Sequence, residues 1–448
     1  MPCLATDVRS ALRRVLFLVA ATALATGLAG CETANLFQGQ PVAQAPAAAP
    51  AETPKLAPAL PAVTPPPQAS MPAAPRVALL LPLSGPNADI GKALLNAAEM
   101  ALFDTADGQF DLLPRDTQGT ADGAAAAAHS ALEAGAGLIL GPFFADEVSA
   151  AAPIARAAGV NIVAFSTDER VAGQGVYLMG FLPRTQVMRV VSYAHAQGLN
   201  RFAAVVPDSA YGQTISDLLR EAVGQAGAQV ANIAVYDPAA NNATQVVRQL
   251  ANYDARHAAL LAQRRALEAA GDDASRQALA RLKNQDAIGD VDFDAIMLPE
   301  GGERLLALAP LLPFFDIDPS RVRLLGTGLW DDPSLGKEPE LVGGWYAAPD
   351  PNLRASFEQR YAALFGAKPP RIATLGYDAT ALAAALARKQ GGPDFSSAAL
   401  TNPNGFAGLD GIFRLRADGL DERGLAVLEV ERDGPKIVSP APTSFATN

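Results

Sequence analysis

Residues 77–99 read VALLLPLSGPNADIGKALLNAAE, an apolar run followed by a loop containing Pro and Gly and then by a helix-forming stretch. A strand that feeds a Gly-containing loop and then a helix is also how many phosphate groups are bound. Here five residues separate Gly85 from Gly91, whereas a phosphate-binding loop has four. Lys92 is followed by Ala93, so the hydroxyl that would hold Mg²⁺ is missing. We interpret the stretch as the opening strand, loop and helix of an α/β fold rather than as a nucleotide site.

The same alternation of short apolar runs and longer amphipathic stretches continues along the chain, which predicts βαβ units and parallel sheets. Expected strands are 77–81, 110–113, 138–140 and 161–165, with helices at 90–103, 121–133 and 147–158 between them. The pattern restarts with strand 202–206, helix 211–226 and strand 229–235, and resumes with strands 295–298 and 322–325. The sequence therefore predicts two α/β lobes, each a parallel sheet flanked by helices, with an interlobe cleft at the carboxyl ends of the strands. Residues 253–290 interrupt the pattern and predict an inserted helical hairpin.

Composition and charge exclude several classes of function. The chain has 448 residues, 50% of them hydrophobic, and a formal net charge of −11. This charge argues against nucleic-acid binding, which requires clustered Lys and Arg.

Motifs for catalysis are weak or missing. Ser334–Lys337 matches the S-x-x-K pattern of penicillin-interacting enzymes, but Gly336 and the neighbouring prolines disfavour the helical turn that this pattern needs. The three histidines, His129, His195 and His257, form no metal-binding spacing. We predict no catalytic residue, no metal and no cofactor.

The N-terminal residues predict a secretory signal. A basic region with Arg9, Arg13 and Arg14 precedes an apolar run that is too short for a stable membrane span. The segment 28–31, Leu-Ala-Gly-Cys, resembles a bacterial lipobox, which implies cleavage of residues 1–30 and lipidation of Cys31. Because Glu32 follows the cysteine rather than Asp, the resemblance implies the inner leaflet of the outer membrane, facing the periplasm. The remainder of 31–75 is rich in Pro and Ala and predicts a disordered tether.

Three segments of the body resemble the type I periplasmic binding proteins of the leucine/isoleucine/valine-binding kind. They are VALLLPLSGPNADIGKALLNAAEMAL, LILGPFFADEVSAAAPIARAAGVNIVAFSTDE and PDSAYGQTISDLLREAVGQAGAQV. The resemblance implies three crossovers between the lobes, expected near Pro183, Tyr346 and Asp410. It assigns 76–182 plus 347–410 to lobe 1 and 183–346 plus 411–448 to lobe 2. By the same resemblance the cleft is lined by Ser84, Phe143, Phe144, Ser166, Thr167, Asp168, Tyr211 and Glu300.

The chain departs from amino-acid-binding members of that family at two places. Their Ser- and Thr-rich stretch, which holds the ligand α-carboxylate, is here Phe143-Phe144-Ala145-Asp146, and a buried Asp would repel a carboxylate. Near the strand that carries the usual acidic clamp for the amine, Asp331 and Asp332 are the candidates.

Two functions are open at this point. The lipobox, the tether and these departures make the chain most similar to the outer-membrane penicillin-binding protein activators. That resemblance implies a non-catalytic lipoprotein whose partner is a bifunctional penicillin-binding protein, a murein synthase. The alternative is an ABC-transporter solute-binding lipoprotein for a branched-chain amino acid, amide or similar small ligand. Both keep the lipid anchor in the membrane, and both allow a small molecule in the cleft.

Overall fold

The computed structural model describes residues 74–105 and 110–445. The predicted signal peptide, the predicted lipidation site Cys31 and nearly all of the predicted tether lie outside these residues. Ser70–Asn448 forms one compact unit. Among the described helices, none is both long and apolar enough to cross a bilayer.

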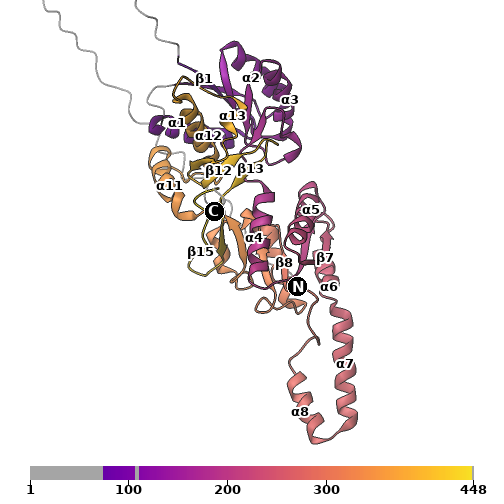
Figure 1. The fold of residues 1–448 in the computed structure, drawn as a ribbon. Coiled ribbons are helices and arrows are strands. Elements are labelled where there is room, and N and C mark those ends of the chain that lie inside the picture. The colour runs from indigo at the N-terminus through magenta and orange to yellow at the C-terminus, as the bar shows by residue number, and fades with distance from the viewer. Residues whose placement is uncertain (1–73, 106–109, 446–448) are drawn as a thin grey trace, which may run out of the picture. The chain divides into compact units, whose positions relative to one another are not determined.

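The first lobe contains a five-stranded parallel sheet in the order β2-β1-β3-β4-β5 (Figure 1). Its strands are β1 (Arg76–Leu81), β2 (Asp111–Asp116), β3 (Ala136–Leu140), β4 (Asn161–Ala164) and β5 (Val176–Leu178). Its helices are α1 (Ala88–Thr105), α2 (Ala121–Glu133), α3 (Ala145–Ala157), α11 (Pro351–Phe365), α12 (Ala373–Ala387) and α13 (Ser397–Leu400). Strand β1 lies next to the sheet centre and is buried on both faces. This is why residues 77–81 form an uninterrupted apolar run.

Alternate residues of β1 serve the two faces of the first sheet. Val77, Leu79 and Leu81 pack in one core cluster with α1 and α12, whereas Ala78 and Leu80 pack in another with α2 and α3. The period of two along the strand thus assigns each side chain to one helical layer.

The second lobe contains a seven-stranded sheet in the order β15-β14-β10-β9-β8-β6-β7, in which only β14 and β15 run antiparallel to their neighbours. Its strands are β6 (Arg201–Pro207), β7 (Gln229–Tyr236), β8 (Ala295–Met297), β9 (Arg323–Gly326), β10 (Trp345–Ala348), β14 (Ala426–Glu429) and β15 (Lys436–Ser439). Its helices are α4 (Pro183–Ala196), α5 (Ala210–Gln225), α6 (Ala243–Leu250), α9 (Gly302–Leu308) and α10 (Leu311–Phe314). Two helix-flanked lobes with parallel sheets confirm the predicted fold class.

The chain passes between the lobes three times, after β5, after β10 and after β13 (Asp421–Arg423). The third passage comes later than the expected position near Asp410. Strands β11 (Phe406–Gly408), β12 (Gly411–Leu415) and β13 form a small antiparallel sheet. Phe413 and Leu415 of this sheet are buried in the core of the first lobe. Burial of these two apolar side chains places 411–423 with lobe 1, although the family resemblance assigned this segment to lobe 2.

Gly91 shows what the opening Gly-Lys pair does in the folded chain. A Cβ atom at Gly91 would lie 2.1 Å from the carbonyl oxygen of Pro82, so only glycine lets α1 approach the preceding loop this closely. Lys92 is exposed on the outer side of the helix. The glycine therefore serves helix–loop packing, which explains the motif without a phosphate.

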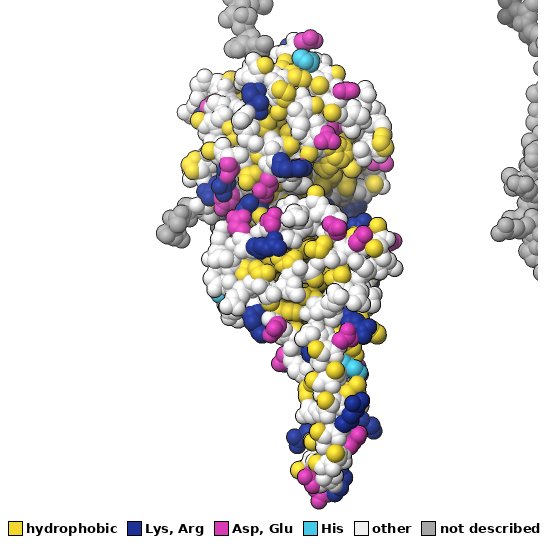
Figure 2. Space-filling model, turned by 90° about the vertical axis from the view of Figure 1, so that its right-hand side faces the viewer, with side chains coloured by type: hydrophobic (Ala, Val, Ile, Leu, Met, Phe, Trp, Pro, Cys, Tyr) yellow, Lys and Arg dark blue, Asp and Glu magenta, His cyan; other side chains and the backbone are white. Residues whose placement is uncertain are grey.

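Helices α7 (Tyr253–Ala270) and α8 (Asp273–Leu282) form an arm that projects from the second lobe (Figure 1). Arg264 of α7 joins the two helices of the arm, because it donates hydrogen bonds to the carbonyl oxygens of Leu282 and Gln285. Basic and acidic side chains are interspersed along its surface in Figure 2, where the arm is the narrow lower extension.

Asp378 on α12 makes the stability of the fold depend on pH. Burial, together with the nearby Asp410 carboxylate, raises the pKa of Asp378 to about 7 from an ordinary 3.8. The folded state therefore binds a proton more tightly than the unfolded chain. The resulting stability is complete below pH 4 and is lost as the pH rises through about 7.

We expect urea unfolding of the full chain to give a lower free energy of unfolding at pH 8 than at pH 5. The slope contributed by one group is at most about 1.4 kcal/mol per pH unit. Asp378→Asn retains an acceptor for the backbone N–H of Leu409, which bonds Oδ1 at 2.7 Å, and should reduce the drop. An Asn variant that kept the full slope would show that Asp378 is not the group responsible.

Candidate functional site

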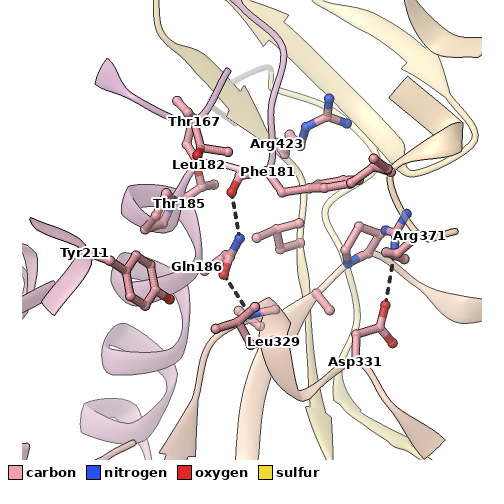
Figure 3. A pocket seen from close by; sticks show the side chains of 17 residues that line it. Thr167, Phe181, Leu182, Thr185, Gln186, Tyr211, Leu329, Asp331, Arg371 and Arg423 are labelled. Atoms are coloured by element: carbon pink, nitrogen blue, oxygen red, sulfur yellow. Dashed lines mark hydrogen bonds and ion pairs between the residues drawn. The ribbon is translucent and has the colours of Figure 1, made fainter. Parts of the chain in front are cut away.

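A cavity of about 440 Å³ lies where the three crossovers meet. Each crossover contributes to its wall: Phe181, Leu182 and Pro183 from the first, Ala347, Ala348 and Pro349 from the second, and Arg423 and Leu425 from the third. Because both lobes supply wall residues, any relative movement of the lobes changes the size of this cavity. Figure 3 shows the wall residues converging from helix α4, the strands and the loops.

Gln186 joins the first crossover to the second lobe in the wall of the cavity. It lies one turn into α4, a helix that starts with Pro183 at its first position. Its Nε2 donates to the carbonyl oxygen of Phe181 at 3.0 Å, and its Oε1 accepts from the backbone N–H of Gly328 at 2.6 Å (Figure 3). The Gln186 side chain thereby holds the first crossover against the turn η2 (Gly328–Trp330) that follows β9.

Asp331 forms ion pairs that cross from the second lobe to the first. It follows η2, and its carboxylate lies 3.0 Å from Nη2 of Arg354 on α11. The same carboxylate lies 3.1 Å from Nε of Arg371 (Figure 3). Arg371 in turn donates to Asp410 at 2.8 Å. The side chains of Asp331 and Asp410 are 4% and 0% exposed, so both carboxylates depend on the arginines for compensation.

The Phe181 ring lies between two guanidinium groups. Arg371 and Arg423 lie with Cζ 4.4 Å and 5.1 Å from its centroid. Arg423 is also paired with Asp421 at 2.8 Å. The charged groups around the cavity therefore have partners within the protein, since Arg354 and Arg371 face Asp331 and Asp410, and Arg423 faces Asp421. Burial raises the pKa of Asp421 to about 7.

Two of the predicted cleft residues, Thr167 and Tyr211, line this cavity. Thr167 follows β4, and Tyr211 lies in the first turn of α5. The Tyr211 hydroxyl lies 3.3 Å from Oγ1 of Thr327, and burial raises the pKa of Tyr211. The phenol is therefore a neutral hydrogen-bonding group at physiological pH.

Phe143 and Phe144 lie at the N-terminus of α3, outside the wall of this cavity. Their backbone N–H groups donate to Oε2 of Glu147 at 3.3 and 3.0 Å. Oε1 of Glu147 accepts from the hydroxyl of Thr117 at 2.5 Å, and burial raises the pKa of Glu147. The amides that the resemblance assigned to a ligand carboxylate are thus satisfied by a carboxylate of the chain itself.

The remaining predicted residues lie after the carboxyl ends of strands but outside this cavity. Ser84 donates to Asp116 at 2.6 Å, and Ser166 accepts from the backbone N–H of Asp168 at 3.1 Å. Asp168 itself pairs with Arg170. Glu300, 5% exposed, accepts from the Tyr236 hydroxyl, and burial together with this carboxylate raises the pKa of Tyr236.

The S-x-x-K match has a structural role, and the three histidines lie on different helices. Ser334 and Lys337 belong to a 3-10 helix, η3 (Pro333–Lys337), whose first turn is capped by Asp332. The histidines are on three separate helices, α2, α4 and α7. Across the described residues, no group of three or more His, Cys, Asp or Glu side chains is arranged to hold a metal ion.

Sequence reasoning missed Phe181, Gln186, Leu329, Arg371 and Arg423, all of which line the cavity. Phe181 could have been predicted from the sequence, because it lies two residues before the expected crossover at Pro183. The arginines carry no local pattern that marks them.

Comparison with known proteins agrees with this architecture. A family model described as "periplasmic binding protein" matches residues 75–435. An uncharacterized protein of Rickettsia prowazekii (strain Madrid E) is 24% identical over 176 residues, which are 39% of this chain and 47% of that protein. The match therefore spans about half the length of that relative.

Solved structures of binding proteins superpose on most of the chain. One from Rhodospirillum rubrum, provisionally named a branched-chain amino acid ABC transporter, has a TM-score of 0.64 at 19% identity and covers 82% of this chain and 100% of its own. A leucine-binding protein of Thermotoga maritima has 0.52 at 18% identity, covering 82% and 98%. A Rhodopseudomonas palustris solute-binding protein in complex with 3,4-dihydroxybenzoic acid has 0.57 at 16% identity, covering 83% and 98%. At these identities the likeness shows the fold.

Proposed function

This chain belongs to the periplasmic binding protein family, and on that basis we propose that its interlobe cavity binds an uncharged small molecule with an apolar body. A cavity of about 440 Å³ is within the range of small-molecule sites. The proposal makes the protein a solute receptor that acts without catalysis.

The observation that carries this proposal is the internal cancellation of charge around the cavity. A zwitterionic amino acid needs an unpaired acceptor for its ammonium group and unpaired donors for its carboxylate. Asp331 is already paired with Arg354 and Arg371, and the exposed Asp332 caps a turn by accepting from the backbone N–H of Ser334. A charged ligand would have to break one of these pairs to gain its own.

Apart from the buried Nη1 of Arg423, the groups that stay available are neutral. Gln186 uses one of its two Nε2 hydrogens on Phe181, and Thr167, Thr185 and Tyr211 present hydroxyl groups to the cavity. Apolar wall residues surround them: Leu182, Leu329, Ile372, Leu425 and the prolines Pro183 and Pro349. An amide, alcohol or ether on a small apolar skeleton fits this set.

The receptor role extends to uptake and location as part of the same proposal. Similar structures include a protein named as an ABC transporter substrate-binding protein, from Sphaerobacter thermophilus. We infer that this chain serves a transporter in the same way, anchored through lipidated Cys31 and facing the periplasm. The comparisons favour this role over activation of a murein synthase.

Activation of a murein synthase remains a second candidate because of the α7–α8 arm. The arm projects from the second lobe and is fastened at its base, where Arg256 donates to the carbonyl oxygen of Gly289. Deleting 258–284 leaves that base in place. Loss of synthase stimulation in this variant, with ligand binding unchanged, would assign the arm to the activator role. Stimulation that persists without the arm would show that another surface is responsible, and absence of stimulation by the natural chain would remove this candidate.

The receptor proposal is tested by thermal shift of the full chain with isovaleramide, isovalerate and L-leucine, which share a branched skeleton. We expect stabilisation by the neutral amide and little by the two charged compounds. Stabilisation by leucine alone would contradict the proposal and would indicate a receptor for an amino acid instead.

Leu329 offers a direct way to change the preferred charge of the ligand. It lines the cavity and is 51% exposed, so Leu329→Arg adds a cation without emptying the core. We expect the variant to bind benzoate at least about tenfold more tightly than the natural chain does, because a charge-assisted bond contributes roughly 1.5–3 kcal/mol. Leu329→Gln, of similar size and no charge, is the matched control, and isothermal titration measures both.

A further inference from the structure

We propose that a second groove, beside the ligand cavity, binds an acidic peptide segment through Arg189. The groove has a volume of about 1430 Å³ and is lined by α4 and α5 of the second lobe, by the β12–β13 hairpin of the first lobe and by residues 440–445. The groove adjoins the cavity assigned above to a small ligand and shares Thr185, Arg423 and Leu425 with its wall. The inference concerns a different ligand and goes beyond that function.

Among the residues that the structure describes, five arginines and four carboxylates line the groove. Four of the arginines have acidic partners: Arg184 with Glu221 at 2.8 Å, Arg414 with Glu422 at 2.7 Å, Arg416 with Asp418 at 2.8 Å, and Arg423 with Asp421 at 2.8 Å. These pairs use all four carboxylates.

Arg189 is the fifth arginine and differs from the others. Within the described part of the chain its guanidinium contacts only uncharged oxygens, namely the Leu425 carbonyl at 3.0 Å, the Ser439 hydroxyl at 2.6 Å and the Pro440 carbonyl at 3.3 Å. Burial lowers the pKa of Arg189, whereas the ion-paired Arg184 on the same helix has a raised pKa. A half-buried cation without a counter-ion is costly, and a carboxylate from outside would compensate it.

A second arginine in the wall of the groove, Arg423, also has an incomplete set of hydrogen bonds among the described residues. Its side chain is 2% exposed, and its Nη1 has no hydrogen-bond partner among the described residues. Its other nitrogens donate to Asp421 and to the carbonyl oxygen of Met179.

The dimensions and the wall of the groove favour a peptide. Its volume exceeds the usual 300–1,000 Å³ of small-molecule pockets. Residues 440–445 run along it without helix or strand pairing, so an extended chain has main-chain neighbours as well as the arginine. The partner is therefore a peptide segment that carries carboxylates.

The test uses isothermal titration of the full chain with acetylated, amidated hexaglutamate, and with hexaglutamine as the neutral probe. We expect hexaglutamate to bind at least about tenfold more tightly, and its affinity to fall as salt is raised. Equal binding of the two peptides, or none by hexaglutamate, would overturn the proposal.

Ser192→Glu locates the site without removing a contact of Arg189. Ser192 is exposed, lines the groove and lies one helical turn after Arg189 on α4. A glutamate there supplies the missing counter-ion at i+3 and should abolish preference for hexaglutamate. Arg189→Gln should do the same, Arg189→Lys should retain part of it, and Arg388→Gln, which removes an exposed cation outside the groove, should retain all. Preference that survives Ser192→Glu would place acid binding elsewhere.

Discussion

Replacing Asp331 by alanine is expected to lower the free energy of unfolding by about 3–5 kcal/mol, because it leaves buried arginines without their partner. Arg354 and Arg371 both bond to this carboxylate, and the Arg354 side chain is 10% exposed. Arg354 loses its ion pair with an almost fully buried carboxylate and keeps the one with Glu358, at 3.0 Å. Urea unfolding of the full chain measures the change.

Asp331→Ala should also separate the lobes. Both lost ion pairs join the second lobe to the first, one through Arg354 on α11 and the other through Arg371, just before α12. Small-angle scattering should therefore show a larger radius of gyration for the variant under native conditions. Asp332→Ala is the control, because this exposed neighbour caps only a short turn and should cost about 1 kcal/mol. Equal effects of the two substitutions would contradict an interlobe role for Asp331.

Trp330→Ala is expected to cost a further 3–5 kcal/mol by emptying a core position. Trp330 is fully buried, its Nε1 donates to the carbonyl oxygen of Leu298 at 3.1 Å, and its ring fits against Gly326 and Gly344. A Cβ on Gly326 would lie 2.2 Å from the ring. The indole therefore determines where the turn η2 lies.

The same substitution should weaken ligand binding, since Leu329 and Asp331 flank Trp330 and both line the cavity. Phe314→Ala provides a matched control because this aromatic side chain is 70% exposed and should change stability by under about 0.5 kcal/mol. A stable Trp330→Ala protein with unchanged ligand affinity would show that the turn is positioned by other contacts.

The parts of the fold that sequence predicted are those with a local physical cause. Strand β1 could be located because burial on both sheet faces demands five consecutive apolar residues, 77–81. Gly91 was noticed for its spacing, and its packing against Pro82 explains why it is a glycine. The end of lobe 1 was harder to predict. Apolar and polar residues alternate along β12 and β13 in the same way whichever lobe buries Phe413 and Leu415.

The cavity was less predictable because its groups act through partners that are distant in the sequence. Asp331 was named together with Asp332 as a candidate clamp for a ligand amine, but its pairing with Arg354 and Arg371 depends on how α11 and α12 pack on the first lobe. The satisfaction of the Phe143 and Phe144 amides by Glu147 also depends on the geometry of the first turn of α3. The pairing of charges is a property of the folded chain, so residue types alone argued only against an α-carboxylate, at Phe143–Asp146.

The central claim, that the interlobe cavity selects a neutral ligand, is tested most directly by comparing benzamide with benzoate in isothermal titrations. The two molecules have nearly the same shape and differ in one formal charge, and the natural full chain is used at constant salt. The account predicts that benzamide binds at least about tenfold more tightly, a difference of about 1.4 kcal/mol. Tighter binding of benzoate would contradict the claim. Its carboxylate would then be bound by a free cation, whereas in the structure Arg371 is paired with Asp331 and Asp410, and Arg423 with Asp421.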